Sequence, residues 1–194
     1  VAMAADCVIA ITDGLQNELI HRGVSPEKIM LAVNGVDVER FVPLNRDYEL
    51  ADKIGLPTGP VVGYIGSLVQ YEGLHLLLEA VKKLRILGHW NGSVLIVGDG
   101  ESRGDLESLA EELGISDVCF FTGKVDFREV NRYYSLIDIC PFPRLPEKVC
   151  ELVSPLKPFE AMAMGKTVLA SNVEAMREFI ENGTNGFLFE KGSS

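Results

Sequence analysis

The chain has 194 residues, of which 47% are apolar and 24% charged, and its formal net charge at pH 7 is −10. This composition excludes disordered and collagen-like classes and predicts a single globular domain with an ordinary core. The acidic excess repels phosphate backbones and argues against a nucleic-acid partner, although a local basic pocket could still bind a small phosphorylated ligand. No apolar run reaches the roughly 20 residues that cross a bilayer, so we expect the domain to be soluble.

The ends of the sequence and its cysteines support two further expectations, one about the extent of the chain and one about its thiols. Because the chain begins with Val1 rather than methionine, and ends with Ser194 just after an apolar stretch, we expect it to be a piece of a longer protein. The cysteines at 7, 119, 140 and 150 are widely spaced and show no metal-ligand pairing. We expect them to be buried and reduced, which indicates a cytoplasmic protein.

Strands and helices are predicted to alternate along the chain. Short apolar runs rich in β-branched residues predict strands at 7–12, 29–33, 61–66, 94–98, 118–122, 137–142, 167–170 and 187–189. Helical stripes lie between them, the clearest running from Leu74 to Leu87 and stopping at Gly88, with others at 106–113, 130–134 and 159–164. A further helix is expected between the first two strands. This order predicts an α/β fold, with a doubly wound, mainly parallel sheet and helices on both faces.

Ligands of a doubly wound sheet bind beyond the carboxyl ends of its strands, so the loops there are the candidate sites. Gly66-Ser67-Leu68 follows a predicted strand, and its N–H groups could approach a phosphate. Any strand-to-helix turn tends to hold glycine, so a scaffold role explains this loop equally well. Gly98-Asp99-Gly100 with Gly104 resembles a dinucleotide fingerprint, but its spacing is one residue too long, and we discount it.

The strongest constellation of charge precedes and begins the predicted helix at 159–164. Arg144 and Lys157 are two cations that could neutralise a diphosphate, next to the free N–H groups of a helix start. Glu160, one turn into the helix, is placed to accept hydrogen bonds from ribose hydroxyls. The alternative is that Pro158 merely starts the helix and that the charged side chains are solvated. Spacing alone slightly favours that alternative.

Six stretches, taken in order along the chain, resemble the motifs of one protein family, and the resemblance covers essentially the whole chain. They are Asn34-Gly35-Val36-Asp37 with Phe41; Gly66-Ser67-Leu68 with Gly73-Leu74; Val97-Gly98-Asp99-Gly100; Phe121-Thr122-Gly123; Pro155-Leu156-Lys157-Pro158-Phe159-Glu160-Ala161-Met162-Ala163; and Glu181-Asn182-Gly183-Thr184-Asn185-Gly186-Phe187. In this order they resemble the group-1 family of retaining glycosyltransferases, which have two Rossmann-like domains in the GT-B architecture and use nucleotide-sugars.

The resemblance implies a domain assignment and a set of donor contacts. Residues 34–194 would be the nucleotide-sugar-binding domain without its last crossover helix, and residues 1–33 would come from the end of the N-terminal acceptor domain or the interdomain connection. Glu160 would bind the ribose as the second acid of a paired-glutamate motif, and backbone atoms around Lys124 and Val125 would read the base edge. The candidate donor-binding residues are Gly66, Ser67, Gly98, Lys124, Val125, Ser154, Pro155, Leu156 and Glu160.

The chain also departs from the family pattern at its diphosphate clamp. The family usually has Arg after the glycine of the first loop and Lys just before the later glycine, whereas this chain has Ser67 and Glu72. We hypothesise that Arg144 and Lys157 replace this clamp and stabilise the leaving diphosphate.

A second departure concerns the paired acids. The first acid should lie eight residues before Glu160, where this chain has Leu152, with Glu151 one residue further away. Glu151 is therefore the candidate that reaches the donor sugar, and Glu151, Arg144 and Lys157 are the catalytic candidates.

The expected function is retaining transfer from a UDP-, GDP- or ADP-linked sugar to a glycan, lipid or small-molecule acceptor, without a metal or further cofactor. Because the acceptor domain is absent, we expect the fragment alone to be inactive. The full protein is expected in the cytoplasm, and peripheral association with the inner face of the membrane stays open. The alternatives are a nucleotide-sugar epimerase or phosphorylase of the same architecture, and a non-catalytic nucleotide-binding domain.

Overall fold

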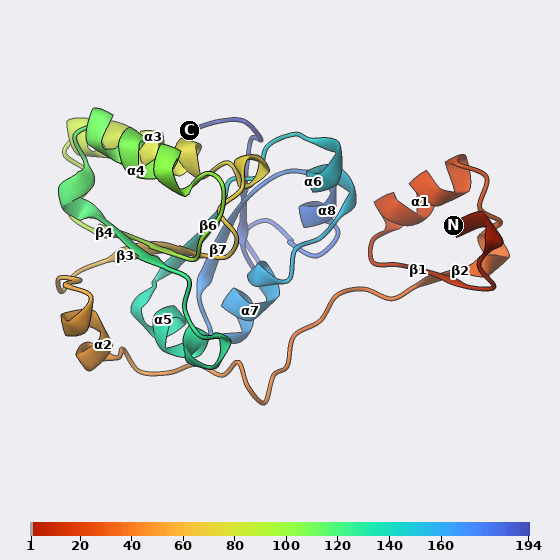
Figure 1. The fold of residues 1–194 in the computed structure, drawn as a ribbon, viewed down its shortest axis with the longest axis horizontal. Coiled ribbons are helices and arrows are strands. Elements are labelled where there is room, and N and C mark those ends of the chain that lie inside the picture. Colours follow the sequence, from red (N-terminus) through yellow and green to blue (C-terminus); the bar gives the residue numbers. More distant parts are fainter. Residues whose placement is uncertain (1) are drawn as a thin grey trace.

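The computed structural model describes residues 2–194 and contains two separate parallel sheets (Figure 1). Strands β1 and β2 pair with each other, and the other six form one sheet in the order β5-β4-β3-β6-β7-β8. The strands are β1 Val8–Ala10, β2 Ile29–Leu31, β3 Val61–Ile65, β4 Ser93–Val97, β5 Cys119–Gly123, β6 Ile139–Phe142, β7 Thr167–Ser171 and β8 Phe187–Phe189. All eight predicted strands are present and all pairings between them are parallel.

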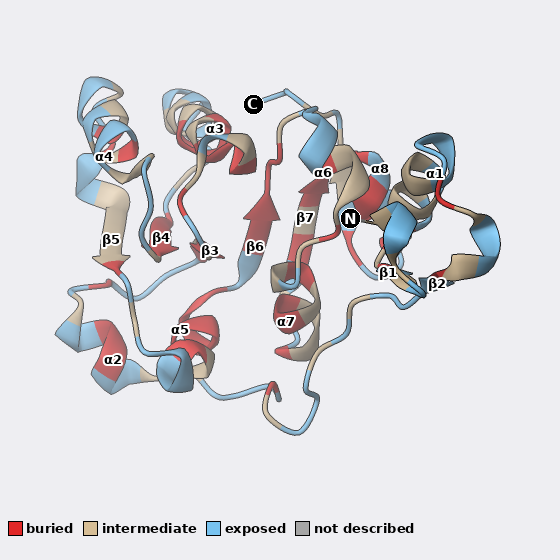
Figure 2. Ribbon diagram, turned by 45° about the vertical axis from the view of Figure 1, so that its right-hand side comes forward, coloured by how far each residue is buried: buried red, intermediate tan, exposed pale blue. Residues whose placement is uncertain are grey.

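The order of the large sheet reverses between β3 and β6, which is the doubly wound topology predicted from the sequence. Helices α3 and α4 cover one face, and α5 and α7 cover the other (Figure 2). The helices are α1 Asp13–His21, α2 Tyr48–Lys53, α3 Leu74–Ile86, α4 Arg103–Glu112, α5 Val130–Leu136, α6 Lys148–Leu152, α7 Lys157–Ala163 and α8 Glu174–Arg177. The prediction missed α2, α6 and α8, which are too short to show a helical stripe.

Glycines end the longer helices as the sequence predicts. After α3, Gly88 adopts a left-handed φ of 70° and the N–H of His89 donates to the carbonyl of Leu84 at 2.9 Å. Gly114 after α4 and Gly165 after α7 have φ values of 65° and 70°. Glycine adopts this conformation without steric cost, so each helix ends sharply and the chain turns back toward the sheet.

The core lies on both faces of the central strands. Every residue of β4 is buried, which explains why the strand is continuously apolar after Ser93 rather than alternating. Cys140 and Cys150 are also buried, and burial raises the pKa of the Cys140 thiol to about 12. The expectation of buried thiols is wrong for Cys7, which is exposed because it precedes β1 outside the large core. All four thiols are free.

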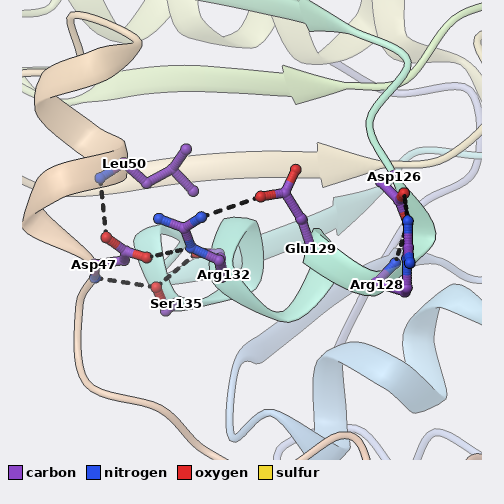
Figure 3. Close-up of polar contacts among 7 residues, drawn as sticks. All are labelled: Asp47, Leu50, Asp126, Arg128, Glu129, Arg132 and Ser135. Carbon is purple, nitrogen blue, oxygen red and sulfur yellow. Dashed lines mark hydrogen bonds and ion pairs between the residues drawn. The ribbon is translucent and has the colours of Figure 1, made fainter.

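Helix α2 is among those that the sequence did not predict, and Asp47 explains why it forms (Figure 3). One carboxylate oxygen of Asp47 accepts from the N–H of Leu50 at 2.9 Å, which caps the helix, and the other accepts from Arg132 Nε at 2.6 Å. The N–H of Asp47 donates to the hydroxyl of Ser135 at 3.1 Å. The bond from Arg132 lowers the pKa of Asp47. Contacts with α5 therefore stabilise a helix that is too short to form alone.

The small sheet and α1 form a separate unit beside the larger one (Figure 1). Its own core contains Ala10, Val24 and Ile29. Hydrogen bonds join the two parts. The backbone N–H groups of Asp13 and Gly14, at the start of α1, each donate to the Glu178 carboxylate at 3.0 Å. An acid at a helix N-terminus interacts favourably with the helix dipole as well as with these free donors. Residues 32–47 then connect this unit to α2.

Candidate functional site

An open cavity of about 530 Å³ lies at the carboxyl ends of β3, β4 and β5. Three loops follow these strand ends. Lys157, at the start of α7, lines the cavity from the neighbouring half of the sheet. The lining residues are Ile65, Gly66, Ser67, Val97, Gly98, Asp99, Gly100, Lys124, Val125, Phe127, Val130 and Lys157. The cavity is therefore where a doubly wound fold places its ligands.

Glycines form the floor of this cavity because two loops meet there without space for a side chain. A Cβ added to Gly98, whose φ is 136°, would lie 1.8 Å from the carbonyl oxygen of Gly66, and one added to Gly100 would lie 2.3 Å from that of Leu68. The N–H of Leu68 donates to the carbonyl of Asp99 at 3.0 Å. Packing between the loops thus accounts for Gly98 and Gly100 of the discounted fingerprint, whereas a Cβ added to Gly104 would meet no atom within 4 Å.

Lys157 is the cation that the start of α7 presents to the cavity. Its Nζ lies 3.0 and 3.1 Å from the two carboxylate oxygens of Glu160, one turn later. The hydroxyl of Tyr134 donates to the same carboxylate at 3.1 Å, and Glu160 is only 6% exposed. Burial, followed by the Glu160 charge, raises the pKa of Tyr134 well above its usual value. The structure therefore brings Lys157 and Glu160 together, with Lys157 at the lining and Glu160 behind it.

Arg144 occupies a different place from the one expected for a diphosphate clamp. It follows β6, is 3% exposed, and does not belong to the cavity lining. Its Nη1 donates to the carbonyl of Val153 at 2.7 Å and its Nε lies 3.4 Å from Glu72 Oε1. Burial raises the pKa of Glu72, although the charge of Arg144 opposes this shift. The two cations predicted to act together therefore do not share one cavity in this structure.

Glu151, the candidate for contact with the donor sugar, faces the C-terminal part of the chain. Lys191 Nζ donates to its Oε1 at 2.6 Å, and the N–H of Glu174 at the start of α8 donates to its Oε2 at 2.7 Å. Desolvation raises the pKa of Glu151, but the bonds from Lys191 and Glu174 outweigh it, and the pKa is lowered. Both oxygens are thus engaged outside the cavity lining.

The segment between α6 and α7 carries the remaining predicted residues. Ser154 is buried, and the Asn34 amide donates to its carbonyl at 2.8 Å and its hydroxyl at 3.2 Å. Pro155 and Leu156 follow, and Leu156 is half exposed. Within the described part of the chain, no hydrogen bond uses the backbone N–H groups of Leu156 or Lys157, as is usual in a first helical turn.

Sequence reasoning missed Phe127 and Arg40 at the cavity rim. Phe127 lines the cavity and is 55% exposed, and the Arg40 guanidinium carbon lies 3.5 Å from its ring centroid. Arg40 also donates to the Phe127 carbonyl. The signal available in the sequence was an aromatic residue two positions after Val125 in a ligand-side loop. Arg40 lies in the connection before α2, far from Phe127 in the sequence. No pattern of neighbouring residues therefore predicts that the two side chains meet.

Two further properties of residues 2–194 bear on cofactors and membranes. This part of the chain has no group of three or more His, Cys, Asp or Glu residues arranged to hold a metal ion. None of the helices within the same residues has the length and apolar character that crossing a bilayer requires.

Comparison with known proteins agrees with the fold. The model of the family described as Glycosyl transferases group 1 matches residues 59–194. The chain belongs to this family, as the ordered motifs led us to expect. Its parallel sheet, with helices on both faces, is the Rossmann-like fold of the GT-B glycosyltransferases that it resembles.

Individual relatives match almost the whole chain but extend well beyond it. The chain is 27% identical over 190 residues to the lipopolysaccharide core biosynthesis glycosyltransferase LpsE of Rhizobium meliloti, covering 97% of this chain and 51% of that protein. Anabaena Alr3699/HepE, solved in complex with UDP-glucose, is 25% identical with a TM-score of 0.84, covering 98% of this chain and 51% of HepE. The chain thus spans about half the length of these two relatives.

A third similar protein is itself a single domain. The C-terminal domain of a group 1 family glycosyl transferase, LpcC from Francisella tularensis, is 27% identical with a TM-score of 0.65. The match covers 82% of each chain. A domain of nearly this extent has therefore been crystallised separately from the rest of its protein.

Proposed function

We propose that the chain binds the nucleotide-sugar donor of a glycosyltransferase in the cavity at the ends of β3, β4 and β5. The observation that carries this proposal is the cavity itself, which combines glycine loops, the Lys157 ammonium and an exposed aromatic ring, Phe127. Family membership and the UDP-glucose complex of HepE support the same ligand class. Backbone N–H groups and a cation suit a diphosphate, and the aromatic rim suits a base.

Each part of the donor has proposed contacts. The base would lie near Lys124 and Val125, and the diphosphate near the Gly66-Ser67 loop, Gly98 and Lys157. Glu160 would accept hydrogen bonds from the ribose, exchanging its present contact with Lys157 for the hydroxyl groups. The segment Ser154-Pro155 leads into the N–H groups of Leu156 and Lys157, which would hold phosphate oxygens.

Two cations, Lys124 and Lys157, line the cavity. We assign the charge-stabilising role to Lys157 because it lies at the start of α7 beside the free N–H groups, whereas Lys124 lies where we place the base. As the leaving diphosphate accumulates negative charge, an ammonium group in a partly enclosed cavity stabilises it. A role for Glu151 toward the sugar would require it to release Lys191 or the N–H of Glu174. We propose retaining transfer on the basis of the family resemblance, and a cytoplasmic location on the basis of the four free thiols.

We also propose that residues 1–33 belong to the acceptor side of the full protein. Parallel sheets are normally covered on both faces, and two strands alone are marginally stable. In the small sheet, Ile9 and Met30 are 57% and 52% exposed on the face away from α1. The chain covers only about half of LpsE and of HepE, which supports the proposal that the full protein has a further domain packed on this face. The fragment without that domain would bind donor but transfer nothing.

Calorimetric titration of the chain with UDP, GDP and ADP tests the donor site. Replacing Lys157 with alanine should weaken binding of the preferred nucleotide at least about tenfold, because a charge-assisted hydrogen bond contributes about 1.5–3 kcal/mol. The salt dependence of binding should fall as well. Lys148→Ala is the matched control, since Lys148 is exposed and pairs with Glu18 on α1. Unchanged affinity in Lys157→Ala would contradict the proposal.

A non-catalytic nucleotide-binding domain is the second candidate, favoured by the buried acid at position 72, where the family usually has lysine. The full-length protein distinguishes the two. Release of nucleoside diphosphate together with a new glycosidic bond supports transfer, and the anomeric configuration of the product, read by NMR, tests retention. Nucleotide binding without either event favours the second candidate. Isomerisation of the donor without nucleotide release would instead indicate an epimerase.

A further inference from the structure

A buried ion pair bridges the point where the large sheet reverses its strand order. Glu72 lies after β3 and is 8% exposed, whereas Arg144 follows β6 and is 3% exposed. Their Oε1 and Nε atoms are 3.4 Å apart, and this Nε has no hydrogen-bond partner among the described residues. Burying two charges is costly and often stabilises a fold no better than apolar residues would. A function beyond stability would explain why the pair is present.

The contacts of Arg144 join segments that surround the proposed donor site. Its guanidinium carbon lies 5.9 Å from the ring centroid of Tyr71, and the N–H of Leu145 donates to the Tyr71 carbonyl at 2.9 Å. Its own carbonyl accepts from the Ser171 hydroxyl, at the end of β7, at 2.8 Å. Its Nη1 holds the carbonyl of Val153 at 2.7 Å. One side chain thus links the loop after β3 to the segment before α7.

That segment leads directly into the groups proposed to bind phosphate. Val153 is followed by Ser154, which Asn34 holds from the other side, and then by the free N–H groups of Leu156 and Lys157. If the carbonyl of Val153 were released, the segment would keep the Asn34 contact at Ser154 and the Tyr134 hydroxyl, which lies 3.4 Å from the Lys157 carbonyl. Arg144 is thus the anchor at the start of the segment, and Glu72 is the charged group that faces its guanidinium.

We propose that Arg144 and Glu72 are a positioning pair, which fixes residues 154–157 for the donor diphosphate by holding the Val153 carbonyl, without either side chain touching the donor. This inference rests on the proposed function. A direct contact is disfavoured because the guanidinium is buried, outside the cavity lining, and neutralised by Glu72. The pair would thus favour binding of the diphosphate by orienting backbone N–H groups, whereas a cationic clamp favours it by direct charge attraction.

The test compares two variants of the pair with Lys157→Ala. The double variant Glu72→Leu, Arg144→Met removes both buried charges and should unfold within a few degrees of the wild type. Arg144→Lys keeps the positive charge but loses the guanidinium group, whose separate nitrogens face the Val153 carbonyl and the Glu72 carboxylate. Arg85→Lys is the matched control, because Arg85 pairs with Asp117 at 2.6 Å, away from the cavity lining.

Two measurements distinguish positioning from direct contact. Hydrogen exchange of the hydrogen-bonded amides at the two ends of this segment, Val153, Phe159 and Glu160, measured without nucleotide, should accelerate at least about tenfold in both pair variants and stay unchanged in Arg85→Lys. Calorimetry should show at least about tenfold weaker binding of UDP, or of GDP or ADP if the wild type prefers one of these. The salt dependence of that binding should match the wild type, whereas Lys157→Ala should reduce it.

Several results would overturn the inference. Unchanged exchange at Val153, Phe159 and Glu160 in Arg144→Lys would show that Arg144 does not hold the segment, whether or not the double variant folds. Wild-type nucleotide affinity in a folded pair variant would show that the pair is only structural. A salt dependence reduced as in Lys157→Ala would show direct phosphate contact. If the wild type itself binds none of the three nucleotides, the proposed function fails first, and the positioning role fails with it.

Discussion

Gly73 offers a quantitative test of how the loop after β3 is held against β6. Its φ is 71°, in the left-handed region, and a Cβ added there would lie 2.1 Å from the carbonyl oxygen of Pro143. Gly88, at the end of α3, has nearly the same φ of 70°, but a Cβ there would meet no atom within 4 Å. The two glycines therefore share the conformational cost of an alanine substitution and differ in the steric one.

The magnitudes follow from these two contributions. The left-handed conformation costs an alanine roughly 1–2 kcal/mol, so Gly88→Ala should lose about that much stability. Gly73→Ala adds an overlap with backbone that has to be relieved by moving the loop, which typically costs about 1–3 kcal/mol more. We therefore expect a total loss of about 2–5 kcal/mol for Gly73→Ala.

Equilibrium denaturation in urea, with circular dichroism and tryptophan fluorescence as probes, measures both variants against the wild type. Coincident transitions would justify a two-state free energy of unfolding. Equal losses of stability in Gly73→Ala and Gly88→Ala would refute the close approach of the two loops, because conformation would then account for the whole effect. A loss confined to Gly73→Ala would refute the conformational contribution instead.

Three further predictions concern individual side chains. Because the folded pKa of Glu151 is lowered from 4.5, its ionised form stabilises the fold above that pH, and the stability is lost as the pH falls through the folded pKa. Glu151→Gln should thus be about 1 kcal/mol less stable at pH 7, and this difference should shrink in pH-dependent denaturation as the pH falls through the folded pKa. Glu178→Ala removes the acceptor of two N–H groups at the start of α1 and should speed proteolysis within residues 32–47. In thiol titration, exposed Cys7 should react at once, whereas buried Cys140, with a pKa of about 12, should react only on unfolding.

Each of these three predictions has an outcome that would contradict it, and the Glu178 prediction also has a control variant. Gln in place of Glu178 keeps one acceptor oxygen and should show a smaller increase in proteolysis than alanine, so equal rates would contradict the capping role. A Glu151→Gln difference that does not shrink at any pH below 4.5 would show that its cause is not ionisation. Rapid labelling of Cys140 in the folded chain, checked by peptide mapping, would contradict its burial.

Local sequence patterns were sufficient for most of the fold. Continuous apolar runs located all eight strands, and periodic stripes located α3, α4, α5 and α7. Both signals report contacts within one element, which depend only on neighbouring residues. The glycines after the longer helices were readable for the same reason, because a left-handed residue is a local requirement. The family motifs likewise located the loops that line the cavity.

The tertiary structure alone decided which distant side chains meet. Arg144 and Lys157 looked like one clamp in the sequence, but strand order places Arg144 against Glu72 and leaves Lys157 at the cavity. Helix α2 depends on Asp47 meeting α5, and the partners of Glu151 come from the end of the chain. Such pairs form because a sheet brings loops from separate strands to one edge, a proximity that spacing along the chain does not encode.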